Sequence, residues 1–172
     1  MSKFAAYNID LKALEKGKHT YAYTLDDAYF AKIDSIEIQR GDVSAQVDVM
    51  VSAAGYEVKF HVEGNIIIAC DRCLDDMQQA IKADDSLRVR LGDELMDDGD
   101  VMVLPERDPV LNVAWFLYEL IALAIPIKHV HAPGECNKTM AAKLRSHTAI
   151  NLDEDEDEDD EEDDEMFYED ED

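Results

Sequence analysis

The sequence predicts an α+β domain in which a mainly antiparallel sheet, able to curl toward a barrel, is packed by one long C-terminal helix. Two runs of alternating apolar and polar residues flank Ala54-Gly55, a pattern typical of an antiparallel hairpin. A later apolar segment repeats at helical spacing and ends at Pro126, which predicts the helix. Residues 151–172 are almost entirely acidic and predict a disordered tail.

Strands are predicted wherever apolar and polar residues alternate or β-favouring residues cluster. The run 66–69 is apolar throughout and predicts a strand buried on both faces, which leads directly to Cys70. Asp26 is expected to cap a short helix that reaches Lys32, and residues 40–42 predict a turn. The predicted strands are 18–25, 35–39, 44–51, 56–64, 66–69, 86–91 and 101–104.

Asp108-Pro109 predicts the start of the long helix, because an acidic cap precedes a proline at the first helical position. The helix is expected to cover residues 109–124. Trp115, Phe116 and Tyr118 are interpreted as packing residues of this helix and not as platforms for stacking RNA bases. Its predicted apolar face comprises Val110, Val113, Ala114, Leu117, Leu120, Ile121 and Ala124.

The charge divides the 172-residue chain, whose formal net charge is −25, into a body and a tail. Seventeen of the 20 residues in 153–172 are acidic and none is basic, which leaves 24 acidic and 16 basic residues in 1–152, a net of −8. We therefore expect one domain over 1–150 and a disordered tail over 151–172. A mildly acidic body disfavours tight binding to RNA phosphates, because each contact needs a positive partner.

The start of the chain lacks the apolar core of a secretory signal. The longest apolar stretch, Val113–Ile127, includes Glu119 and is too short for a typical membrane span. The chain has three cysteines, an odd number that does not suit a framework of disulfides. We expect a protein of the reducing cytoplasm with no membrane contact.

Cys70 and Cys73 have the spacing of a zinc knuckle, in which two intervening residues let both thiolates face one ion. The remaining cysteine, Cys136, follows His131 by five residues in a loop beyond the predicted helix. If this loop folds back on the knuckle, the four residues form a Cys₃His site. A closed four-ligand site is structural, since it leaves no coordination position open for catalysis. The predicted cofactor is therefore a structural zinc ion.

Two other interpretations of these residues stay open. In the first, Cys70 and Cys73 are reduced thiols that cap a buried strand and bind no metal. In the second, one of these thiols is a nucleophile or redox group with His131 as its base. A thioredoxin-like CxxC opens a helix in a βαβ unit, whereas this CxxC follows a hairpin. With no glycine-rich phosphate loop either, we expect that the protein is not an enzyme.

Arginines mark two further candidate contacts. Arg72, inside the knuckle, could contact a phosphate or a partner, but we expect it to pair with one of the neighbouring aspartates. Arg88 and Arg90 share one face of a predicted strand and, with Lys82, form a small candidate patch for RNA.

The segment Gly64–Leu74 with its C-x-R-C-L turn, the helix Leu117–Pro126, and the closing His131 and Cys136 resemble the YceD family. The resemblance spans roughly residues 20–140. In some relatives cysteine replaces the residue that matches His131, an exchange that a metal ligand allows. Other relatives continue into a further cysteine-rich stretch where this chain has Asn137–Met140.

The resemblance implies a bacterial, non-enzymatic accessory factor of large ribosomal subunit biogenesis, which supports accumulation of 23S rRNA. Its expected partner is a ribosomal protein or a pre-ribosomal particle, with direct contact to rRNA as a further option. The acidic tail then either keeps the protein soluble or holds a basic ribosomal protein. The alternative is a small structural-zinc or thiol protein with a redox or metal-dependent enzymatic function.

Overall fold

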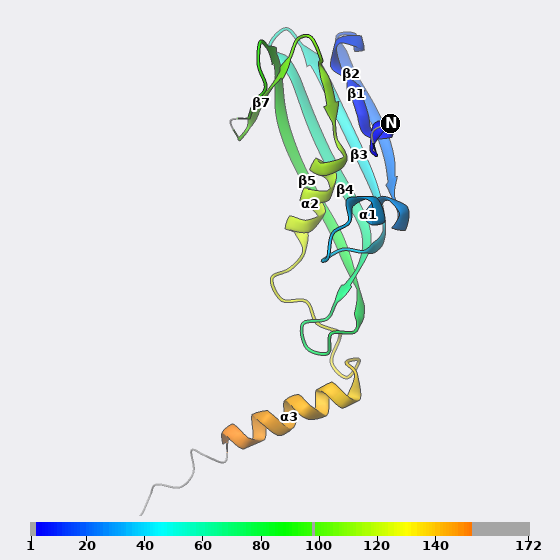
Figure 1. Ribbon diagram of the computed structural model, residues 1–172, viewed down its shortest axis with the longest axis vertical. Helices are drawn as coiled ribbons and strands as arrows, with labels where there is room; N and C mark the ends of the chain where they lie inside the picture. Colours follow the sequence, from blue (N-terminus) through cyan, green and yellow to red (C-terminus); the bar gives the residue numbers. More distant parts are fainter. Residues whose placement is uncertain (1–2, 98, 153–172) are drawn as a thin grey trace, which may run out of the picture.

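The computed structural model describes residues 3–97 and 99–152, which form a long, curved sheet with two helices packed on one face and a third beyond its end (Figure 1). Two 3₁₀ turns, Ala5–Tyr7 and Leu11–Ala13, flank the first strand. The strands are β1 Asn8–Asp10, β2 Gly17–Leu25, β3 Arg40–Ser52, β4 Gly55–Ala69, β5 Asp76–Gly92, β6 Met96–Asp97, β7 Val101–Pro105 and β8 Val110–Asn112. The α-helices are α1 Asp27–Ile33, α2 Ala114–Ala124 and α3 Lys138–Leu152.

The main sheet is mixed and open. Its strand order is β2-β3-β4-β5-β7-β6, and β5 and β7 run parallel while the other neighbours are antiparallel. Within residues 3–97 and 99–152, no pairing joins the edge strands β2 and β6, so the sheet does not close into a barrel. The predicted fold class was therefore wrong: the sheet is mixed, no barrel forms, and short helices replace one long C-terminal helix.

The predicted hairpin is confirmed and is longer than expected. Apolar residues of β3 and β4 alternate toward the core, and Ser52 pairs with Gly55 around a two-residue turn. The turn expected at 40–42 is wrong because β3 already begins there, and residues 35–39 form no strand. The run 66–69 continues β4 with alternating burial, so the strand is not buried on both faces.

Helix α1 forms as predicted after Asp26, whose carboxylate accepts a hydrogen bond from the backbone N–H of Tyr29 at 3.0 Å. Its buried residues Tyr29, Phe30 and Ile33 pack on the sheet beside β3 and β2. The cap satisfies one of the free N–H groups of the first turn, and the spacing of the apolar residues sets which face is buried.

Helix α2 begins five residues later than Asp108-Pro109 predicts. The carbonyl of Pro109 accepts a hydrogen bond from the N–H of Leu11 at 3.0 Å, and residues 110–112 pair with β1 as strand β8. The Asn112 side chain then accepts a bond from the N–H of Ala114 at 3.1 Å, the first residue of α2. Pairing with the N-terminal strand thus overrides the local helix signal, since tertiary contacts routinely outweigh propensity.

The predicted apolar face of α2 is largely confirmed, with Leu117 and Ile121 fully buried. Phe116 stacks on Phe60 of β4 with ring centroids 5.7 Å apart, which ties the helix to the hairpin. Trp115 lies edge-on to Phe4 but stays 51% exposed. The packing role expected for the helix aromatics is therefore strongest for Phe116.

Helix α3 lies beyond the end of the sheet, past the loop that follows α2 (Figure 1). It extends to Leu152. Residues 153–172 lie outside the described residues, and the division into a 1–150 domain and a tail stays a prediction. No helix in the part of the chain that the structure describes is long and apolar enough to cross a membrane.

Gly64 is a position in β4 where the neighbouring strand leaves no room for a side chain. A Cβ on Gly64 would lie 2.3 Å from the carbonyl oxygen of Asp42 and 2.6 Å from the Cα of Val43. Both are backbone atoms of β3, so they cannot move away without breaking the ladder. We expect Gly64→Ala to lower the free energy of unfolding by roughly 1–3 kcal/mol, measured by chemical denaturation.

The matched control is Asn65→Ala, at the next residue of the same strand, where the side chain is exposed. We expect this control to stay within about 0.5 kcal/mol of wild type. Equal unfolding midpoints for the two variants would contradict the close approach of β3 to β4 at Gly64.

Candidate metal centre

The turn between β4 and β5 carries two of the predicted metal ligands. Ala69 and Asp76 are the last paired residues, so the turn spans 70–75 at the far end of the long hairpin. The loop 125–137, between α2 and α3, carries the other two. These segments lie side by side at one end of the molecule (Figure 1).

Backbone hydrogen bonds shape the 70–75 turn around the first cysteine. The N–H of Cys70 donates to the carbonyl of Asp75, and the N–H of Leu74 donates to the carbonyl of Cys70, both at 2.9 Å. Leu74 takes a φ of +63°, the left-handed conformation that reverses the chain. Both thiols are enclosed as a result, with Cys70 0% and Cys73 3% exposed.

A pair of hydrogen bonds clamps the returning loop to this turn. The N–H of Asp71 donates to the carbonyl of His129 at 2.9 Å, and the N–H of His129 donates to the Asp71 carboxylate at 2.8 Å. The His129 ring also lies 3.4 Å from the same carboxylate. The clamp therefore fixes the position of His131, two residues further along the loop.

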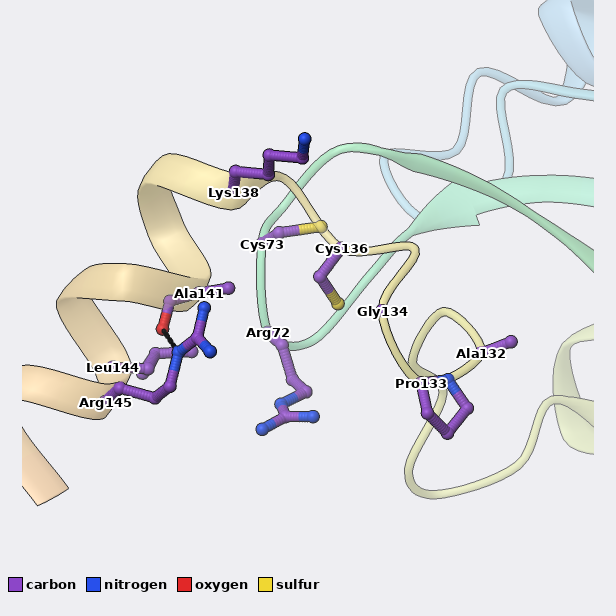
Figure 2. A pocket seen from close by; sticks show the side chains of 10 residues that line it. All are labelled: Arg72, Cys73, Ala132, Pro133, Gly134, Cys136, Lys138, Ala141, Leu144 and Arg145. Carbon is purple, nitrogen blue, oxygen red and sulfur yellow. Dashed lines mark hydrogen bonds between the residues drawn. The ribbon is translucent and has the colours of Figure 1, made fainter.

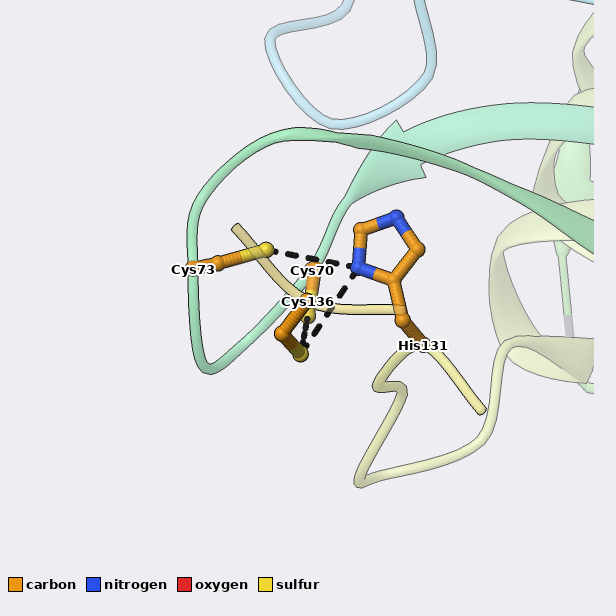
Figure 3. Close-up of side chains that lie close together, drawn as sticks. All are labelled: Cys70, Cys73, His131 and Cys136. Carbon is orange, nitrogen blue, oxygen red and sulfur yellow. Dashed lines mark hydrogen bonds between the residues drawn. The ribbon is translucent and has the colours of Figure 1, made fainter. Parts of the chain in front are cut away.

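The four predicted ligands meet beside this clamp, with their ligand atoms within 4.8 Å of one another (Figure 3). The Cys70 and Cys136 sulfurs are 3.9 Å apart. Nδ1 of His131 lies 3.3 Å from the Cys73 sulfur and 3.9 Å from that of Cys136. Bond lengths for tetrahedral zinc imply ligand separations of roughly 3.6–3.8 Å, so the arrangement fits such an ion.

The orientation of His131 also suits a metal ligand. Its Nε2 lies 3.1 Å from the backbone carbonyl of Asp76, which can only accept, so Nε2 carries the proton. Nδ1 then directs its lone pair toward the thiols. Ligating histidines commonly donate their second ring nitrogen to a carbonyl or carboxylate in this way, which fixes tautomer and ring orientation.

The local electrostatics keep Cys70 ready to act as a ligand. Burial raises the pKa of its thiol, but hydrogen bonds from backbone N–H groups, that of Cys73 first, outweigh burial and lower the pKa to about 6. The hydrogen bond to Cys70 raises the pKa of His131, whereas burial and the neighbouring thiols raise the pKa of Cys136. A thiolate is the form that binds metal, so Cys70 provides an anionic anchor near neutral pH.

A family model described as large ribosomal RNA subunit accumulation protein YceD matches residues 58–169. The chain belongs to the YceD family. The match contains the whole Cys₃His cluster, which is Cys70, Cys73, His131 and Cys136, and it confirms the resemblance noted in the sequence. The chain matches no curated protein and no solved structure.

In this YceD-family chain the four predicted residues lie together and could hold a metal ion, while zinc itself stays a prediction. The sequence patterns did not predict the clamp between Asp71 and His129, nor the contact of His131 with the Asp76 carbonyl. Three of the clamp's four groups and the Asp76 acceptor belong to the backbone, and almost any residue type supplies those. Asp71, the acidic residue inside the CxxC, was the one sequence feature that could have indicated the clamp.

The arginines differ from expectation. Arg72 pairs with none of the neighbouring aspartates in the described part of the chain, because Asp71 contacts His129 and Asp76 pairs with Arg40. Lys82 pairs with Glu63 at 3.2 Å. Arg88 and Arg90 lie exposed on β5, as the strand pattern predicted, but whether this patch meets RNA stays a prediction.

Substitution of His131 distinguishes a metal site from a cluster of hydrogen-bonded thiols without metal. We expect the purified chain to hold about one zinc ion, His131→Cys to keep it, and His131→Ala to lose most of it. Metal content measured by mass spectrometry after gel filtration reads this out. His61→Gln is the matched control, since His61 lies on β4 with its ring nitrogen Nδ1 2.6 Å from the Asp84 carboxylate, away from the thiols. Equal metal loss in the His131 and His61 variants would contradict the assignment.

The Asp71 clamp should tune the affinity of the site without supplying a ligand. We expect Asp71→Ala to weaken zinc binding by roughly 10- to 100-fold, the range typical of residues that position ligands, measured by competition with a chelator. Asp75→Ala is the matched control in the same turn, because only its backbone carbonyl bonds within the described residues. Unchanged affinity in Asp71→Ala would show that the loop returns without the clamp.

Proposed function

We propose that this protein is a non-enzymatic accessory factor in the biogenesis of the large ribosomal subunit, and that its Cys₃His cluster holds a structural zinc ion. The chain belongs to a family described as large ribosomal RNA subunit accumulation proteins, which supports a role in biogenesis of the large subunit. The four ligands support a non-enzymatic role, because a metal held by all four has no open position for a substrate.

The surface around the cluster supports a role in binding. Leu74 at the tip of the turn is 68% exposed and Ile36 is 94% exposed. Both line the same cavity of about 260 Å³, beside Arg40 and His129. Large apolar side chains grouped with polar neighbours at a surface mark interaction sites, so this end of the molecule is the proposed docking surface.

A ribosomal protein is the partner that the charges favour over rRNA itself. The lysines on the outer face of the sheet are paired, as Lys18–Asp48, Lys59–Glu57 and Lys82–Glu63, which leaves Arg88 and Arg90 as the exposed cations of β5. Phosphate contacts need positive charge that is free to approach the backbone. Ribosomal proteins are basic, and an acidic protein attracts them over the distance set by ionic screening.

The thiol-enzyme alternative, with Cys70 or Cys73 as nucleophile and His131 as base, has two supporting observations: the lowered pKa of Cys70 and the 3.3 Å between the Cys73 sulfur and Nδ1 of His131. A nucleophile must also reach its substrate, and both thiols are almost fully enclosed. A bound zinc ion would occupy both the thiol and His131, and neither could then act as nucleophile or base. The metal content of the purified chain therefore tests this alternative.

The proposal is tested in cells that lack the gene. We expect the ratio of large- to small-subunit rRNA to fall and the tagged wild-type chain to restore it and to co-sediment with particles that contain large-subunit rRNA. Leu74→Asn should weaken co-sedimentation about five- to tenfold, the loss typical of a central contact residue. Asparagine tolerates the left-handed backbone at this position, so the turn keeps its shape.

Leu95→Asn is the matched control, as Leu95 is 66% exposed but lies in the acidic loop away from the cluster. We expect it to behave as wild type. An unchanged rRNA ratio on deletion, together with no enrichment in ribosomal particles, would overturn the proposed function.

A further inference from the structure

A second cavity, of about 520 Å³, lies on the α3 side of the Cys₃His cluster (Figure 2). The knuckle turn contributes Arg72 and Cys73, the returning loop contributes Pro133 and Cys136, and α3 contributes the remaining wall. The cavity is therefore built from three segments that the cluster itself brings together.

The charged side chains that line this cavity are all basic among the described residues: Arg72, Lys138 and Arg145. None of the three pairs with a carboxylate in the part of the chain that the structure describes. Helix α3 itself, from Lys138 to Leu152, contains three Lys or Arg residues and no acidic one. In a chain with a net charge of −25, this is a local concentration of unpaired positive charge.

The floor between these cations is apolar. Pro133, Ala141 and Leu144 line it, with Leu144 42% exposed at the surface of α3. Figure 2 shows Arg72 from the turn and Arg145 from the helix lining one hollow together with these groups. The lining therefore suits a ligand that combines apolar side chains with negative charge.

The C-terminal segment of the same chain has this composition. Residues 153–172 hold 17 acidic residues and a single apolar group, Met166-Phe167-Tyr168, which lies between Glu165 and Glu169. The apolar group matches the floor of the cavity, and the flanking glutamates match its basic rim. A nucleic acid backbone would use the cations but has no apolar side chain to set against the floor.

The chain is long enough for this contact. Helix α3 has 15 residues, which places its end about 21 Å from its start at 1.5 Å per residue. The 13 residues 153–165 span up to about 45 Å when extended. The segment can therefore fold back along α3, and tethering supplies an effective concentration of about the millimolar order.

We propose that residues 165–169 dock in the cavity formed by the knuckle turn, the 132–136 loop and α3. Phe167 and its apolar neighbours cover the floor, and Glu165 and Glu169 face the basic rim. The docked tail covers the side of the cluster formed by Cys73 and Cys136, and it competes with any acidic partner for the same cations. The contact stands independently of the ribosomal role.

Zero-length carbodiimide coupling of the full chain tests this contact, with peptide mapping of the amide links. Lys138 lines the cavity, whereas Lys143 lies on the same helix outside it. We expect links from Lys138 to Glu165 or Glu169. Replacing Met166, Phe167 and Tyr168 by serine keeps every charge, and we expect it to reduce the Lys138 links about tenfold while the Lys143 links stay unchanged.

Arg145→Glu gives an independent variant on the cavity side, with Lys143→Glu as its matched control. We expect Arg145→Glu to reduce the Lys138 links and Lys143→Glu to leave them in place. Lys138 links that survive the triple serine change would show unspecific charge attraction and overturn the proposal. Links that join ¹⁴N- and ¹⁵N-labelled chains in a mixture would show that the tail of a second copy occupies the cavity. That result would also overturn the proposal.

Discussion

The hydrogen bonds between Asp71 and His129 are the constraint on which the rest of this end of the molecule depends. They join residues 58 positions apart, one in the knuckle turn and one in the loop after α2. Without them, the loop would keep the bond from His131 to the Asp76 carbonyl but would lose its attachment to the 70–75 turn ahead of His131. Ordering a chain costs about 1–2 kcal/mol per residue. With them, His131 and Cys136 lie beside two buried thiols, and α3 starts where it can form the wall of a cavity.

A metal ion and the clamp stabilise the same contact in different ways. The clamp satisfies backbone groups and the Asp71 carboxylate, whereas a zinc ion would neutralise the thiolates that burial otherwise penalises. Because Cys70 directly follows β4 and Cys136 lies in the segment before α3, the cluster couples the hairpin to the C-terminal helix. The basic cavity depends on the cluster, because the cluster brings together the knuckle turn, the returning loop and α3, which form its walls.

Sequence patterns predicted what side-chain chemistry and periodicity encode. The β3–β4 hairpin, the Asp26 cap and the four members of the Cys₃His cluster could all be read from residue type and spacing. The pairing of β1 with β8, the parallel contact of β7 with β5 and the Asp71–His129 clamp could not. These depend on backbone groups that meet across long separations, and Asp108-Pro109 shows how such pairing converts a strong helix signal into a strand.

X-ray absorption at the zinc edge of the purified full chain tests the central claim most directly, because it reports the ligands of the metal itself. The account predicts three sulfur neighbours at about 2.3 Å and one nitrogen at about 2.0 Å, with no oxygen neighbour. A first shell with fewer sulfurs and a bound water, or a folded chain that binds no zinc, would contradict a closed structural site.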